Sequence, residues 1–423
     1  MNAQVRIARL AANRSVHRAF HWLHLHQPQV RKWHLEILRI PAPPFGEQAR
    51  AAWFLERFIQ LGLANAHIDA AGNALAELPA SESRTSPVIL LSAHLDTVFP
   101  ASTPSDPVEL DTRIAAPGAC DNAAGLSGLL ALAAALRHAE LVPPVTILFA
   151  ANVGEEGEGD LRGMRHLFDP EASPYASRIA GSIVLEGGGS HAVVTRALAS
   201  RRFRVTVTGP GGHSWTDAGA PNPILQLARA LLSLEAIGQT TLDRSPLGDE
   251  VSPHRATHRT TLNIGQIAGG TAVNSIPASA SAWLDLRSTD QDQLRAAELA
   301  IRQSLDQWAT LSPAGAANQP HTPNLTIEII GDRPGGALPS DSPLLATLRA
   351  VDRHLNLRTE PGLGSTDANI PLSRNIPAIA IGAGGSGGGI HTLQEWYDPT
   401  GRNAALRRIL LTLLDTAHLA AQP

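Results

Sequence analysis

The sequence has little of the residue types on which several common chemistries depend. Its 423 residues include one cysteine, Cys120, and one lysine, Lys32. A single cysteine excludes an internal disulfide, which fits a reducing cytoplasm. The lysine lies in the polar segment QPQVRKWHLE, which is suited neither to a Walker A loop nor to a Schiff-base pocket. ATP-loop and pyridoxal chemistries are therefore poor expectations.

Long apolar runs and basic runs are also missing. The net charge is −4 and no cluster of basic residues provides a nucleic-acid footprint. No apolar stretch reaches the roughly 18 residues that a membrane span needs, and the N-terminus lacks the apolar core of a signal peptide. We therefore expect a cytoplasmic protein whose partners are neither nucleic acid nor membrane.

The length and the apolar pattern predict two domains of different construction. From residue 88 on, the runs PVILLSAH, VTILFAAN, GSIVLE and IPAIAIG are nearly continuous and of strand length. Such runs suit strands buried on both faces of a mostly parallel sheet. Helical stretches are predicted between them at 123–138, 163–169 and 343–355, and residues 1 to about 80 look helical with a break at 41–47. The alternation predicts an α/β domain.

A different pattern interrupts this domain. The segment 198–333 contains the alternating run RRFRVTVTG, an amphipathic stretch, the runs TTLNIGQI and ASAWLDLR, a second helical stretch and LTIEII. This order predicts a β-α-β-β-α-β unit with half-exposed strands. We expect a metal-binding catalytic domain formed by residues 1–197 and 334–423, and an inserted α+β domain formed by residues 198–333.

Acidic and imidazole side chains stand at the ends of the apolar runs or in glycine-rich loops. The segments read LLSAHLDT, GACDNAAG, ANVGEEGEG, SIVLEGGG and GGGIHTLQEW. Functional groups in open α/β sheets gather at the carboxyl ends of strands. Side chains of this kind, brought to one sheet edge, are the ligands of a two-metal hydrolytic centre.

Taken singly, these side chains leave alternatives open. His94 and Asp96 are two residues apart, so in an extended chain both aim at one site, but a solvated His–Asp pair has the same pattern. Glu155 and Glu156 repel each other unless cations or protons separate them, or they form a solvated acidic loop. Asp121 could bridge two cations or cap a helix. Only the joint placement of these residues beside the predicted sheet edge favours metal binding.

The series of motifs resembles one family. In order, these motifs are HLDT, DNAAG, GEEGEG, LEGGG, GGHSW, GGTAVNSIPASASAWLDLR, GSTDANIP and GGIHTLQEW. From about residue 35 to the C-terminus they are similar to the M20 family of co-catalytic zinc metallopeptidases. The resemblance implies a zinc-binding α/β domain interrupted by a lid domain through which a homodimer forms.

The resemblance also implies a ligand set for two Zn²⁺ ions, with Co²⁺ or Mn²⁺ as possible substitutes. Asp121 would bridge both metals through a loop with a cis peptide bond to the next residue. His94 and Glu186 would complete one site, and Glu156 and His391 the other.

Further roles follow from the same motifs. The resemblance implies that Glu155 is the general base and that Asp96 orients the histidine ligand. In the inserted domain, His213 would stabilise the oxyanion, and Asn274 is a second candidate donor. Arg287 could pair with a substrate carboxylate, because a planar guanidinium suits bidentate binding.

The expected reaction is cleavage of an amide bond in small peptides or N-acyl amino acids by a metal-activated water, in the manner of a carboxypeptidase or dipeptidase. In the family, the position of Glu186 is usually Asp in aminopeptidases, which disfavours an activity like that of peptidase T without excluding it. An N-acyl or N-carbamoyl amino acid deacylase is the main alternative. A non-catalytic dimeric binding protein on the same scaffold is a remote one.

Overall fold

The computed structural model describes residues 2–80, 87–234, 237, 259–311 and 324–422. The chain divides into two compact units. The first unit comprises Met1–Ala197 and Gly336–Pro423, and the inserted unit comprises Leu198–Gly335. Within the described residues, no helix combines the length and apolar character needed to span a bilayer.

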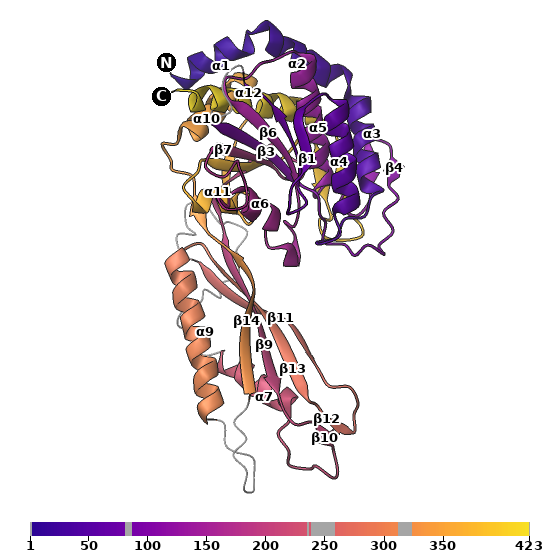
Figure 1. The fold of residues 1–423 in the computed structure, drawn as a ribbon, viewed down its shortest axis with the longest axis vertical. Coiled ribbons are helices and arrows are strands. Elements are labelled where there is room, and N and C mark those ends of the chain that lie inside the picture. The colour runs from indigo at the N-terminus through magenta and orange to yellow at the C-terminus, as the bar shows by residue number, and fades with distance from the viewer. Residues whose placement is uncertain (1, 81–86, 235–236, 238–258, 312–323, 423) are drawn as a thin grey trace. The chain divides into compact units, whose positions relative to one another are not determined.

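The first unit is built on a nine-stranded mixed sheet in the order β1-β2-β6-β3-β7-β17-β8-β15, with β16 paired to β8 (Figure 1). The strands along this path are β1 (Ala64–Ile68), β2 (Ala74–Leu78), β6 (Thr146–Asn152), β3 (Val88–His94), β7 (Ile179–Leu185), β17 (Ala378–Ile381), β8 (Ala192–Ala197) and β15 (Gly336–Ala337), and β16 is Glu360–Gly364. The four central strands β6, β3, β7 and β17 are parallel. They are the four apolar runs of the sequence, so the predicted α/β class is confirmed.

Both faces of this sheet are covered. In β3, Ile89 and Leu91 belong to one core, while Val88 and Leu90 belong to a second core. The first core contains residues of α1 (Ala3–Ala11), α2 (Arg14–Leu25), α3 (Gln27–Leu38), α4 (Gln48–Gln60), α5 (Ala123–His138), α10 (Pro343–Leu355) and α12 (Arg402–Ala420). The second contains α6 (Arg162–Leu167) and part of α11 (Asn369–Ser373). Full burial on both sides explains why β3 and β6 lack a polar alternation.

The N-terminal 80 residues differ from the prediction, which contained helices and a break but no strand. They contain helices α1 to α4, but also strands β1 and β2. The sequence of β2, ALAEL, consists of good helix formers. It becomes a strand because it pairs with β6 on one side and β1 on the other, and tertiary pairing overrides a weak local propensity.

A small four-stranded sheet joins two loops of the first unit. Its order is β18-β19-β5-β4, and its strands are β18 (Ser386–Gly388), β19 (Trp396–Asp398), β5 (Arg113–Ala115) and β4 (Val108–Leu110). Strand β5 precedes Asp121, whereas β18 and β19 flank His391. The sheet therefore brings together segments that are far apart in the sequence.

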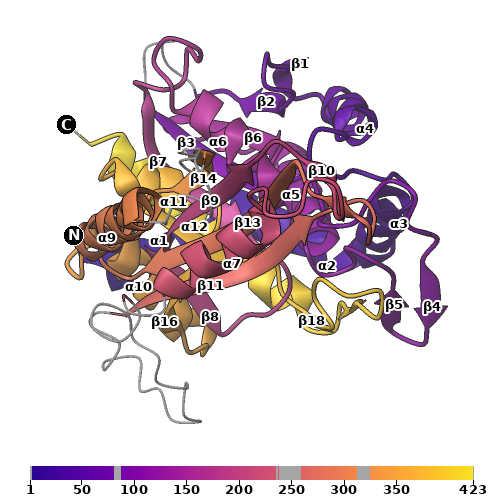
Figure 2. The same cartoon turned by 90° about the horizontal axis from the view of Figure 1, so that it is seen from below.

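The inserted unit is an antiparallel sheet in the order β11-β13-β9-β14 (Figure 2). These strands are β11 (Thr260–Gly269), β13 (Ser279–Ser288), β9 (Ala199–Thr208) and β14 (Asn324–Arg333). Helices α7 (Pro223–Ser233) and α9 (Gln291–Leu311) share one core with the sheet. The short strands β10 (Gly212–His213) and β12 (Ser275–Ile276) form a separate ribbon. Apart from this ribbon, the described residues of the inserted unit have the predicted order β-α-β-β-α-β.

A buried histidine in α3 makes stability depend on pH. His34 is fully buried, stacks on Tyr397 with ring centroids 5.0 Å apart, and lies 3.3 Å from the Ser127 hydroxyl. Burial, together with the charge of Arg402, lowers the pKa of His34 to about 3. The unfolded histidine titrates near 6.5, so between these values only the unfolded chain gains this proton. Stability is therefore lost as the pH falls below about 6.5.

We expect this one group to lower the unfolding free energy by about 2 kcal/mol between pH 6.5 and pH 5. Urea unfolding of the wild type and of His34→Gln at both pH values measures the contribution, since the variant lacks the titrating ring. The matched control is His17→Gln, which changes an exposed histidine. An acid sensitivity that is equal in His34→Gln and the wild type would contradict the assignment.

Candidate metal centre

The candidate ligands follow three neighbouring parallel strands. His94 is the last residue of β3, Glu155 and Glu156 come shortly after β6, and Glu186 follows β7 directly. Strand β3 lies between β6 and β7 and is parallel to both. The carboxyl ends of these strands therefore meet at one edge of the sheet, as the sequence predicts.

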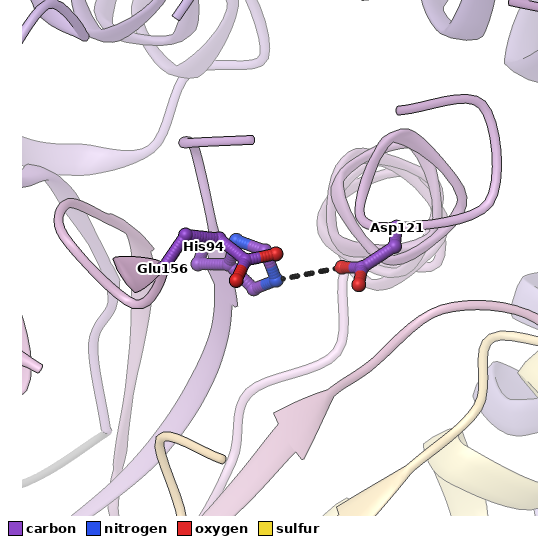
Figure 3. A group of neighbouring side chains, drawn as sticks. All are labelled: His94, Asp121 and Glu156. Atoms are coloured by element: carbon purple, nitrogen blue, oxygen red, sulfur yellow. Dashed lines mark hydrogen bonds and ion pairs between the residues drawn. The ribbon is translucent and has the colours of Figure 1, made fainter. Parts of the chain in front are cut away.

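Asp121 lies between two pairs of ligands. Its Oδ1 is 3.0 Å from His94 Nε2, which is also 3.2 Å from Glu186 Oε1. Its Oδ2 is 3.1 Å from His391 Nε2, which is also 3.1 Å from Glu156 Oε1. Figure 3 shows the carboxylates of Asp121 and Glu156 beside the His94 ring. The structure thus brings all five sequence-predicted ligands together, with one oxygen of Asp121 facing each His–Glu pair.

The spacing of these donor atoms fits a divalent cation. Zinc binds nitrogen and oxygen ligands at about 2.0–2.2 Å in tetrahedral sites, which places the donor atoms of one ion about 3.3 Å apart. The observed separations of 3.0–3.2 Å are close to this value. Donor atoms of His94, Asp121 and Glu156 also lie within 4.8 Å of one another. In addition, Glu186 Oε2 is buried without a hydrogen-bond partner, so this oxygen is available to bind a cation.

The carboxylates of this cluster favour the protonated form of both imidazoles. Burial alone would lower the pKa of His94, but Glu186, Asp121 and Asp96 raise it well above its ordinary value. Hydrogen bonds to Asp121 and Glu156 raise the pKa of His391 to about 10. Burial would raise the pKa of Asp121, yet the two imidazoles bring it well below its usual range. A cation that binds here replaces the imidazole protons, because ligands must be deprotonated.

Asp96 contacts His94 differently from the expected side-chain interaction. His94 Nδ1 lies 3.0 Å from the backbone carbonyl of Asp96, whereas the Asp96 carboxylate is 3.6 Å away. Donation of the Nδ1 proton to that carbonyl leaves Nε2 unprotonated for a metal. The carboxylate instead accepts hydrogen bonds from the backbone N–H groups of Glu155 and Glu156 at 3.0 and 2.7 Å. Asp96 therefore fixes both the imidazole and the acidic turn.

The helix-cap alternative for Asp121 does not hold. The N-cap of α5 is Asn122, whose Oδ1 accepts hydrogen bonds from the N–H groups of Gly125 at 3.1 Å and Gly187 at 2.9 Å. Its Nδ2 donates to the Leu185 carbonyl at 2.9 Å. The Asp121–Asn122 peptide bond is cis, as the resemblance implies. Asn122 thus ties the Asp121 loop to the end of β7 and leaves the Asp121 carboxylate for the site.

The turn that carries Glu155 and Glu156 is held by close packing. A Cβ atom on residue 159 would lie 2.5 Å from the Cα of Gly154. Only glycine therefore allows these two backbone segments to approach so closely. Arg162 then donates to the Glu47 carboxylate and to the Ala71 carbonyl, both at 2.6 Å. These contacts fix the start of α6 and therefore the turn before it.

Two acidic residues near the site were not predicted from the sequence. Asp367 is fully buried and accepts a hydrogen bond from Asn152 Nδ2 at 2.6 Å. Burial raises the pKa of Asp367 to about 7. The charge of His94 lowers this pKa, whereas the charge of Glu186 raises it. Glu395 is also fully buried. Both lie in quoted motifs, GSTDANIP and GGIHTLQEW, but nothing in the local sequence shows that these carboxylates are internal.

The remaining predicted site residues belong to the inserted unit. His213 is exposed, and its Nδ1 accepts hydrogen bonds from the backbone N–H groups of Trp215 and Thr216 at 3.2 and 3.4 Å. A neutral ring in this state carries its proton on Nε2 and can donate it. The backbone carbonyl of Asn274 accepts a hydrogen bond from the backbone N–H of Ser214 at 3.0 Å. These contacts join the His213 and Asn274 loops into one surface.

Arg287 pairs within its own strand. Its Nε donates to Asp285 Oδ2 at 2.6 Å, and its side chain is 40% exposed. The two residues are two positions apart in β13, so their side chains share one face of the sheet. The guanidinium keeps further donors that could bind an anion.

The comparisons with known proteins agree with this site. The sequence profile described as peptidase family M20/M25/M40 matches residues 90–415. The match covers most of the chain and all five candidate ligands, so the protein belongs to this family of peptidases.

Individual relatives are distant. A probable carboxypeptidase of Aspergillus clavatus is 31% identical over 261 residues, which cover 57% of this chain and 54% of that protein. The chain therefore spans about half the length of the curated relatives it matches. Human carnosine dipeptidase 1 superposes with a TM-score of 0.70 at 16% identity, covering 95% of this chain and 100% of that one. A dinuclear metal-binding M20 peptidase of Bacillus subtilis gives a TM-score of 0.61 at 14% identity, covering 92% and 98%.

Proposed function

We propose that this protein is a dizinc hydrolase that cleaves the amide bond of small peptides or N-acyl amino acids, in the manner of a carboxypeptidase or dipeptidase of the cytoplasm. One observation carries the proposal: the two oxygens of Asp121 face two separate His–Glu pairs. A carboxylate placed between two ligand pairs would suit a site that holds two cations, as two-metal hydrolases do. The M20 profile match supports the same conclusion.

Bound divalent cations would supply Lewis-acid activation of the scissile carbonyl and a water of lowered pKa. Asp121, with the His94–Glu186 and Glu156–His391 pairs, would hold them. Two predicted acids lie outside this ligand set, Asp96 and Glu155. The Asp96 carboxylate already accepts hydrogen bonds from the backbone N–H groups of Glu155 and Glu156, so we assign the proton transfers to Glu155. It takes the proton from the attacking water and delivers it to the leaving amine.

Two residues of the inserted unit are assigned roles in the reaction. We assign to His213 the stabilisation of the oxyanion, because its Nδ1 already accepts two hydrogen bonds and leaves Nε2–H as the donor. Asn274 is proposed as a second donor. Strand β11 lies at the edge of its sheet and is mostly exposed, which supports a homodimer formed through this unit. Sedimentation of the purified protein tests the dimer.

Arg287→Ala should raise KM for substrates with a free carboxylate by about tenfold or more, since hydrogen bonds to charged groups contribute about 1.5–3 kcal/mol. The expected change in kcat is small. Paired assays with a dipeptide and its C-terminal amide measure the effect, and Arg204→Ala on the neighbouring strand β9 is the control. An unchanged KM for the free acid would contradict carboxylate anchoring.

The reaction class is tested with protein reconstituted with zinc. Dipeptides, tripeptides, and N-acetyl, N-succinyl and N-carbamoyl amino acids are assayed side by side, with amino- and carboxy-terminally blocked peptides to establish the direction of attack. We expect turnover of dipeptides or of peptides with a free C-terminus. Turnover confined to N-acyl or N-carbamoyl amino acids would assign a deacylase. Binding of two zinc ions without turnover of any member would favour a binding protein.

A further inference from the structure

We propose that Glu395 is a positioning residue of the metal centre, which holds the Asp121 loop in register with the His391 loop. The inference rests on the proposed metal-dependent function. Glu395 itself is not among the ligands. It would act through the backbone that presents Asp121 to the Glu156–His391 pair.

The contacts of Glu395 converge on the chain next to Asp121. Its Oε2 accepts a hydrogen bond from the N–H of Gly118 at 2.9 Å. Its Oε1 accepts from the N–H groups of Cys120 and Asp121, both at 2.8 Å. These are short, charge-assisted hydrogen bonds to a fully buried carboxylate. The path of the chain that ends at Asp121 is therefore set by one side chain from a distant segment.

The same residue belongs to the His391 segment. Glu395 lies four positions after His391 and directly before β19. Its backbone carbonyl accepts from Ala116 N at 3.1 Å, and β19 pairs with β5 in the register Trp396↔Ala115. The two loops are thus joined by backbone pairing on one side and by the Glu395 carboxylate on the other. Displacement of Glu395 would move Asp121 relative to His391.

A carboxylate is the group that this position requires. Three N–H donors point at its two oxygens, and a buried polar group is costly unless it is hydrogen-bonded. A glutamine has one acceptor oxygen, and its NH₂ group would face a donor. A second buried anion beside Asp121 is also unfavourable on its own. Cations bound at Asp121 would relieve this repulsion.

The test measures metal binding rather than turnover. Metal-free wild type, Glu395→Gln and Glu395→Asp are titrated with Co²⁺ and followed by visible absorption, with metal content determined after dialysis. In Glu395→Gln we expect the dissociation constant of the more weakly bound Co²⁺ to rise by about 10–100-fold. A loss of this size is typical when a group that orients metal ligands is removed. The absorption band of that second equivalent should change, and Glu395→Asp should recover part of both losses.

Asp290→Ala is the matched control in the inserted unit. Asp290 Oδ1 also accepts backbone hydrogen bonds, from Asp292 N at 2.8 Å and Gln293 N at 3.0 Å. Its loss should lower Tm and leave both Co²⁺ constants unchanged. If Glu395→Gln lowers Tm but keeps wild-type Co²⁺ constants and spectrum, Glu395 supports the loop only and the inference is wrong.

The outcomes separate this inference from the proposed function. If Glu395→Gln does not fold, Glu395→Asp decides, and wild-type Co²⁺ binding in that variant overturns the role. If the wild type itself binds no Co²⁺, the proposed function fails first. Two bound Co²⁺ ions in the wild type, with identical constants in a folded Glu395→Gln, would overturn the positioning role alone.

Discussion

Asp121→Ala is expected to lose more than half of the bound metal and, with it, detectable hydrolysis. Asp121 is the one ligand whose two oxygens face both His–Glu pairs, so its loss removes a donor from each proposed cation at once. The remaining side chains would leave each cation with one imidazole and one carboxylate. Metal analysis of the dialysed variant should find less than half of the wild-type content, and activity on the best substrate should fall below detection.

The control for this variant is Asp292→Ala, which removes a solvent-exposed aspartate of the inserted unit paired with Arg295. It should keep wild-type metal content and activity, because exposed ion pairs contribute little. A second comparison is Glu186→Ala, which removes a donor from the His94 side only. It should retain up to half of the metal. Full metal content in Asp121→Ala would contradict the bridging assignment, whatever the activity.

Part of the candidate site could be predicted from the sequence, because the signal for its strands is local. The four central strands are continuous apolar runs, and parallel strands place their carboxyl ends at one edge. His94 and Glu186 therefore could be placed beside each other without coordinates. His391 could not, because it follows a glycine-rich loop, and only the resemblance to the M20 family assigned it. Its contact with Asp121 depends on the pairing of β19 with β5, two strands that are far apart in the sequence.

The parts that escaped prediction depend on long-range contacts. Strand β2 has helix-forming residues and becomes a strand only beside β6. The role of Asp96 was expected in its carboxylate, but its backbone carbonyl is the nearer partner of His94. Asn122 and Glu395 form hydrogen bonds with backbone groups. A pattern of side chains does not indicate which backbone N–H groups need an acceptor, so these roles could not be predicted.

Glu155→Gln is expected to separate chemistry from metal binding. The backbone N–H of Glu155 is held by Asp96 Oδ1 at 3.0 Å, so the substitution leaves the turn and the neighbouring ligand Glu156 in place. The amide cannot accept the proton of the attacking water, and kcat should fall by about 10²–10⁴-fold, the usual contribution of a general base. Metal content and Co²⁺ spectrum should stay close to those of the wild type.

The comparison that gives this result its meaning lies within the same turn. Glu158 is exposed, so Glu158→Gln should keep wild-type kcat, whereas Glu156→Gln should lose metal as well as activity. A fall in kcat with unchanged metal in Glu155→Gln alone assigns the proton transfer to Glu155. If kcat in Glu155→Gln is within about threefold of the wild type, less than 1 kcal/mol of barrier depends on that carboxylate, and the proton must pass through another group.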